Sequence, residues 1–248
     1  MVRHTNMDVF NRMNDKTVTP AHVVQTAAES YLFGPDTPCP VLVEPGVLDR
    51  VWIVSGENAG GKSLFCRALQ SLARKEGDKA DKIEIMRVGM EARTTSGIQR
   101  ALMFGDEQTD STGKISISCL LAGINTARKR ENPHWLILDE PDIGVGEGYR
   151  HAIGELFAKF ALDLPELTLG FIVVTHSREI ASPMVAAGAS SVRVGDDLRP
   201  VAEWIANGDL PKTVADLEAL AGRSTHRFRA VNQAMREASA PGQGTRAP

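Results

Sequence analysis

The chain has 248 residues, of which 42% are hydrophobic and 24% are charged, and its formal net charge is −3. This composition is that of a globular protein with one sizeable core and room for a small appendage. It excludes a globally basic surface for nucleic acid. No apolar run approaches the roughly 18 residues of a membrane span, and the N-terminus lacks the layout of a secretory signal, so we expect a cytoplasmic protein without direct membrane insertion.

Residues 1–50 predict a leader that packs on the rest of the chain through one helix and one strand. The helix is expected over residues 20–32, where apolar side chains recur at helical spacing: Val23, Val24, Ala27, Ala28 and Tyr31. The run GPDTPCP then ends it. Cys39 follows in this leader, and Cys66 and Cys119 lie far from it without C-x-x-C spacing, so buried thiols are expected rather than a zinc site.

Residues 51–200 form the predicted core, in which short apolar runs alternate with helical patterns. The runs VWIV, IEIMRV, WLIL and FIVV begin at Val51, Ile83, Trp135 and Phe171. Continuous apolar runs are typical of parallel strands that are covered on both faces. Amphipathic stretches follow at residues 64–72 and 149–160. The alternation predicts an α/β sandwich with a mainly parallel sheet.

The segment GENAGGKS lies directly behind the first apolar run and fits the P-loop pattern G-x-x-x-x-G-K-[ST]. Its glycines allow backbone N–H groups to close on phosphate oxygens, Lys62 can reach the β and γ phosphates, and Ser63 supplies a hydroxyl for Mg²⁺. The helix that follows adds its N-terminal dipole. The predicted phosphate-binding residues are Gly56, Glu57, Asn58, Ala59, Gly60, Gly61, Lys62, Ser63 and Leu64. The fold is therefore predicted to be a P-loop NTPase sandwich.

Two further strands end in polar residues. HWLILDEPD delivers Asp139 and Glu140 at the end of a strand, where ligands of open α/β sheets bind. Asp139 is expected to hold Mg²⁺, and Glu140 to polarise the attacking water. In FIVVTHS the strand ends in Thr175 and His176, and the His176 imidazole can hydrogen-bond a γ-phosphate or that water.

The C-terminal part predicts a helical appendage over residues 201–237 and a disordered tail over residues 238–248. A helix is expected from Val214 to Ala238. It carries the one basic cluster found in the sequence: Arg223, His226, Arg227, Arg229 and Arg236. The cluster is either a solvated helix face or a local surface for nucleic acid or a protein partner.

Together, GENAGGKS, WLILDEPD and His176 resemble the Walker A motif, the Walker B motif with its catalytic glutamate, and the switch histidine of the ATP-binding cassette (ABC) ATPase family. The resemblance covers about residues 51–194 and implies ATP and Mg²⁺ as cofactors, with Glu140 and His176 catalytic. The resemblance also implies a glutamine that contacts the Mg²⁺, together with Ser63 and Asp139. Gln99 or Gln108 can fill that position, and we take Gln99 as the predicted ligand.

The family's LSGGQ signature has an imperfect counterpart in DSTGKIS, which precedes an apolar periodic stretch. Ser111 and Gly113 match two signature positions, and Lys114 could add charge toward a γ-phosphate. Alternatively, Ser111 is a plain helix cap. In the family the signature contacts the ATP of a second subunit, so the resemblance implies an ATP-dependent head-to-tail homodimer.

The interval between Ser63 and Ser111 is too short for the helical subdomain of a transporter cassette or for a long coiled coil. We therefore expect a compact stand-alone ATPase that acts as a conformational switch on nucleic acid or a protein partner, as in DNA handling or phage defence. The alternatives are the ATP-binding subunit of a membrane transporter and a P-loop kinase for a small molecule.

Overall fold

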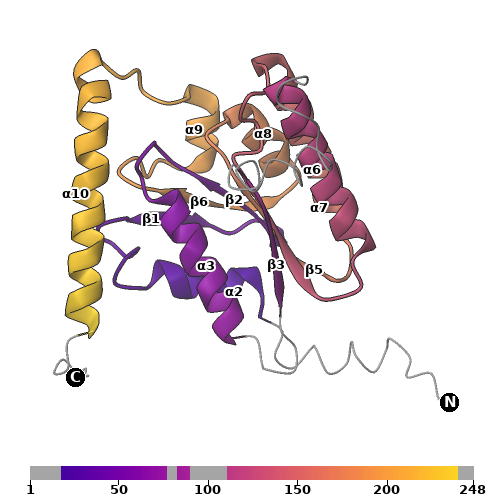
Figure 1. The fold of residues 1–248 in the computed structure, drawn as a ribbon, viewed down its shortest axis with the longest axis horizontal. Coiled ribbons are helices and arrows are strands. Elements are labelled where there is room, and N and C mark those ends of the chain that lie inside the picture. Colours follow the sequence, from indigo (N-terminus) through magenta and orange to yellow (C-terminus); the bar gives the residue numbers. More distant parts are fainter. Residues whose placement is uncertain (1–17, 77–82, 90–110, 240–248) are drawn as a thin grey trace.

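The computed structural model describes residues 18–76, 83–89 and 111–239. Their strands form one six-stranded mixed sheet in the order β1-β6-β2-β5-β4-β3 (Figure 1). The strands are β1 (Val41–Glu44), β2 (Leu48–Ser55), β3 (Glu84–Val88), β4 (His134–Asp139), β5 (Thr168–Val174) and β6 (Ala189–Val194). Strand β1 pairs antiparallel with β6, and the other paired strands run parallel. The predicted α/β class with a mainly parallel sheet is thus confirmed.

Helices cover both faces of the sheet. They are α2 (Pro20–Ala28), α3 (Lys62–Glu76), α6 (Thr112–Lys129), α7 (Arg150–Leu162), α8 (Arg178–Ala186), α9 (Val201–Asn207) and α10 (Val214–Ser239), with a 3₁₀ turn η1 (Glu147–Tyr149). Trp52 and Val54 of β2 pack on the α2 and α3 side, whereas Val51 and Ile53 pack on the α6 to α9 side. This burial on both faces explains why the central strands are continuously apolar.

The leader helix is shorter than predicted. α2 ends at Ala28 rather than at Leu32, and Tyr31 is 51% exposed instead of lying on an apolar helix face. The carbonyls of Leu32 and Phe33 accept hydrogen bonds from the N–H groups of Cys39 and Val41. Before that point, Ser30 N–H donates to Ala27 O and Phe33 N–H donates to Ser30 O, so three-residue turns replace the helical hydrogen bonds after Ala28.

The apolar face predicted for residues 149–160 also begins later than expected. Tyr149 is 67% exposed and lies in η1, where its N–H bonds to the carbonyl of Gly146. α7 begins one residue later, and its buried face starts at Ile153. Cys39 and Cys66 are buried as expected, whereas Cys119, which neighbours the buried Leu120 on α6, is half-buried.

The C-terminal helix α10 stands apart from the layers. Figure 1 shows it at one end of the molecule, with α6 and α7 at the opposite end. Among its 26 residues, Val231 is the one buried side chain. None of the described helices is both long enough and apolar enough to cross a membrane.

Candidate functional site

Three neighbouring strands bring the predicted motifs to one edge of the sheet. The segment GENAGGKS, the predicted P-loop, follows β2, His176 follows β5 and Glu140 follows β4, and these strands are consecutive in the sheet. Main-chain bonds tie the strand ends together: Glu140 N–H donates to Val174 O at 2.8 Å, and Thr175 N–H donates to Val54 O at 3.0 Å. Ligands of open α/β sheets bind at this carboxyl edge.

The P-loop is pressed against the end of β6 and against the leader. A Cβ atom on Gly56 would lie 2.0 Å from Val194 O, and one on Gly60 would lie 2.8 Å from the same oxygen. At Gly61 a Cβ would lie 2.7 Å from Cys39 Sγ. Gly56 and Gly61 also have φ values of 147° and 107°, which side chains rarely tolerate. The loop conformation therefore requires these glycines.

Lys62 is the first residue of α3, and only 6% of it is exposed. Its Nζ donates to the carbonyls of Gly56 at 3.0 Å and Glu57 at 2.9 Å. Burial lowers the pKa of Lys62 to about 8, although the carboxylates of Glu140 and Asp139 oppose the shift. A buried ammonium that bonds to carbonyls in a glycine-rich loop is suited to receive an anion.

His176 connects Lys62 with Glu140. Lys62 Nζ lies 3.4 Å from His176 Nδ1, and His176 Nε2 lies 3.2 Å from Glu140 Oε1. The tautomer with its proton on Nε2 satisfies both contacts, because Nδ1 then accepts from Lys62 and Nε2–H donates to Glu140. The hydrogen bond from His176 is the main cause that lowers the pKa of Glu140.

The backbone of Glu140 adopts the left-handed conformation, with φ of 49°. This conformation is costly for a residue with a side chain, and such strain concentrates at functional sites. Glu140 and His176 have side chains that are 35% and 34% exposed, so both remain accessible to a ligand.

The predicted metal ligands offer suitable oxygen donors. Ser63 is exposed in the first turn of α3, and the Asp139 side chain is 13% exposed and accepts a hydrogen bond from Arg87 Nη2 at 2.5 Å. Among the described residues, no three His, Cys, Asp or Glu side chains gather as a metal site. A hydroxyl, one carboxylate and phosphate oxygens nevertheless match the preference of Mg²⁺. Gln99 and Gln108 lie outside the described residues.

The signature-like residues lie at the start of α6. Ser111 is its N-cap and accepts a bond from Lys114 N–H at 3.3 Å, so the capping alternative is realised. A Cβ on Gly113 would lie 2.8 Å from Gly144 O, which shows how closely this turn packs on the segment after Glu140. Ser111, Gly113 and Lys114 do not line the cavity beside the P-loop.

That cavity has a volume of about 460 Å³, and α10 forms one of its walls. The P-loop side consists of Asn58, Ala59, Gly60, Gly61, Lys62, Ser63 and Leu64, with Cys39, Arg67, Glu140 and His176 beside it. The α10 side consists of Ser224, Arg227, Phe228, Val231, Asn232 and Met235. Sequence reasoning missed this wall, because α10 has the pattern of an ordinary surface helix with one buried side chain.

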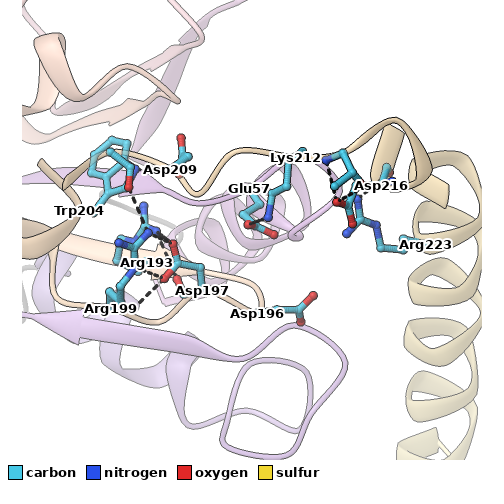
Figure 2. A network of polar contacts seen from close by, with 12 residues as sticks. Glu57, Arg193, Asp196, Asp197, Arg199, Trp204, Asp209, Lys212, Asp216 and Arg223 are labelled. Carbon is cyan, nitrogen blue, oxygen red and sulfur yellow. Dashed lines mark hydrogen bonds and ion pairs between the residues drawn. The ribbon is translucent and has the colours of Figure 1, made fainter. Parts of the chain in front are cut away.

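A hydrogen bond and two ion pairs hold α10 and the segment before it beside the P-loop. Arg227 Nη1 donates to Ala59 O at 2.5 Å, and its Nη2 pairs with Asp196 at 2.6 Å. Lys212, just before α10, pairs with Glu57 at 2.5 Å (Figure 2). The predicted basic cluster is therefore not one outward-facing patch, because Arg227 is directed at the P-loop.

Comparison with known proteins does not assign the chain to a family. No protein-family model matches it, and no curated protein is significantly similar to it.

Proposed function

We propose that this protein is a P-loop ATPase of the ABC type, which binds ATP with Mg²⁺ and hydrolyses it. The observation that carries this proposal is the chain of contacts from Lys62 in the glycine loop through His176 to Glu140. A P-loop alone is compatible with kinases as well. A carboxylate held by a histidine beside the P-loop lysine is better suited to orienting and deprotonating water.

In this proposal each side chain acts on the triphosphate or on the attacking water. Lys62 exchanges its carbonyl partners for β- and γ-phosphate oxygens, and Ser63 and Asp139 would hold the Mg²⁺ that neutralises phosphate charge. Glu140 accepts a proton from the water while the water oxygen forms a bond to the γ-phosphorus. The bond from the γ-phosphorus to the bridging oxygen of ADP breaks, and phosphate leaves. His176 fixes the orientation of the Glu140 carboxylate.

The affinity for ATP is expected to fall above pH 8. Phosphate favours the charged form of Lys62, whose pKa is about 8 rather than its ordinary 10.5 before nucleotide binds. Above that pH, ATP binding requires Lys62 to take up a proton. The affinity is then expected to fall by up to about tenfold for each pH unit. Calorimetric titration with ATP and Mg²⁺ across this range checks the expectation. An affinity that stays level to about pH 10 would contradict it.

We also propose that ATP joins two copies head to tail, with Ser111, Gly113 and Lys114 of one copy at the γ-phosphate of the other. The exposure of Ser111 and Lys114 at the start of α6, away from their own P-loop cavity, is compatible with such an arrangement. The action of this dimer on nucleic acid or a protein partner remains a prediction.

The solution mass tests the dimer. Glu140→Gln is expected to shift from monomer to dimer with ATP and Mg²⁺, and the added Ser111→Arg is expected to abolish the shift by blocking the interface. Ser71→Arg, at an exposed serine on α3, places the same side chain elsewhere and serves as the matched control. An unchanged mass with ATP bound would contradict the dimer and favour the kinase alternative.

A further inference from the structure

The cavity beside the P-loop has two chemically different walls. One wall is the glycine-rich loop with Lys62 and Ser63. The other is α10, which contributes the aromatic Phe228 with Met235 and Asn232, next to Ser224 and the cationic Arg227. A ligand that fills the whole cavity is therefore expected to combine a polyanionic end with a flat apolar end that carries hydrogen-bonding groups.

The position of Phe228 is fixed by its neighbours on α10. Arg227 precedes it and is bonded to Ala59 O and Asp196. Val231 follows three residues later and is buried in the core layer that contains Phe65. Residues three apart lie on the same side of a helix, so these contacts hold Phe228 at the cavity. Phe228 itself is 67% exposed, which leaves its ring accessible to a ligand.

We propose that α10 forms the base-binding wall of the nucleotide site, with Phe228 stacking on the nucleobase and Asn232 meeting its edge. This inference rests on the proposed function, since it assumes that the P-loop holds the phosphates. An aromatic ring stacks on any base, and an amide can both donate to and accept from a base edge. A nucleoside triphosphate has the two ends that the cavity requires, and about 460 Å³ lies within the usual range for small-ligand sites.

A consequence is that the nucleotide would connect α10 to the core. α10 is held by the anchors at Arg227 and Val231 and by the pairing of Lys212 before it, and otherwise it is largely exposed. A ligand that touches both walls would add contacts that stabilise the docked helix. Amide hydrogen exchange in residues 224–239 is therefore expected to slow when ATP binds and to change little with inorganic tripolyphosphate.

The binding experiment compares ATP with inorganic tripolyphosphate, both with Mg²⁺, on the full chain. Phe228→Ala is expected to weaken ATP binding about tenfold or more, because it removes the stacking surface. Its affinity for tripolyphosphate is expected to match the wild type, because the phosphate end is intact. Leu217→Ala is the matched control: Leu217 is 69% exposed on the same helix and does not line the cavity.

The outcomes separate this inference from the function on which it rests. If the wild type binds neither ligand, the proposed function fails and the base wall fails with it. If the wild type binds ATP and Phe228→Ala binds it equally well or more tightly, only the base wall is overturned. In that case the base lies elsewhere, such as in the neighbouring hollow of about 660 Å³ lined by Pro38 and His226, or α10 obstructs the site.

Discussion

The Glu140→Gln variant is expected to bind ATP as tightly as the wild type and to lose at least about 100-fold in turnover. Its amide keeps the size of the side chain but cannot take a proton from water. The left-handed backbone of Glu140 and the hydrogen bond from His176 aim this carboxylate at the edge where the P-loop lies. Phosphate release at saturating ATP measures the loss, and direct titration measures the unchanged affinity.

Glu155→Gln is the control for this loss. Glu155 lies on α7, is exposed, and pairs with His151 at 3.7 Å, so the same chemical change occurs far from the proposed reaction. Its turnover is expected to equal that of the wild type. Turnover at the wild-type level in Glu140→Gln would remove Glu140 from the mechanism and leave the left-handed conformation without a catalytic explanation.

The Lys62→Met variant is expected to lose at least about 100-fold in ATP affinity, because the loop loses its only ammonium while most of the buried stem volume is kept. The fold is not expected to suffer. Burial depresses the pKa of Lys62 to about 8. At neutral pH the charged Lys62 therefore lowers the free energy of unfolding by an amount on the order of 3 kcal/mol. The unfolding temperature without nucleotide is expected to equal or exceed that of the wild type.

Lys75→Met makes the same charge change in the last turn of α3, where Lys75 is exposed. It is expected to bind ATP like the wild type, which separates a local effect at the loop from a change in overall charge. Tight ATP binding by a folded Lys62→Met protein would overturn the P-loop assignment. A lower unfolding temperature would show that Lys62 has a structural role as well.

The central strands could be predicted because each is a continuous run of apolar residues. Strand β6 was missed because it mixes apolar and polar residues. β6 carries Ser190, Ser191 and Arg193, all buried, and such residues do not form an apolar run. Arg193 is tolerated there because Asp197 pairs with it at 2.8 Å and the ring of Trp204 lies 4.7 Å from its guanidinium (Figure 2). Asp197 is only four residues from Arg193, but Trp204 comes from α9 (Val201–Asn207), and a packing contact between a strand and a later helix leaves no periodic pattern in the sequence.

The same distinction applies to the site. The P-loop, Glu140 and His176 each follow a recognisable strand, and the carboxyl ends of parallel strands share one edge of a sheet, so the sequence pattern and the family resemblance were enough to predict that they meet. The α10 wall depends on a contact between Arg227 and Ala59, which are 168 positions apart in the chain. A helix that faces a cavity and one that faces water share the same pattern when only one side chain, Val231, is buried. Packing of this kind is visible only in three dimensions.

The carbonyl of Val194 under the P-loop has a consequence for how this chain should be compared with others. It excludes a side chain at Gly56 and at Gly60 through packing alone, whether or not phosphate ever binds. A descendant that no longer binds nucleotide would still have to retain both glycines. Selection would no longer maintain Lys62, because the burial of its charged group destabilises the fold. Divergence at Lys62 with both glycines intact would therefore mark the loss of nucleotide binding in a lineage that keeps the fold.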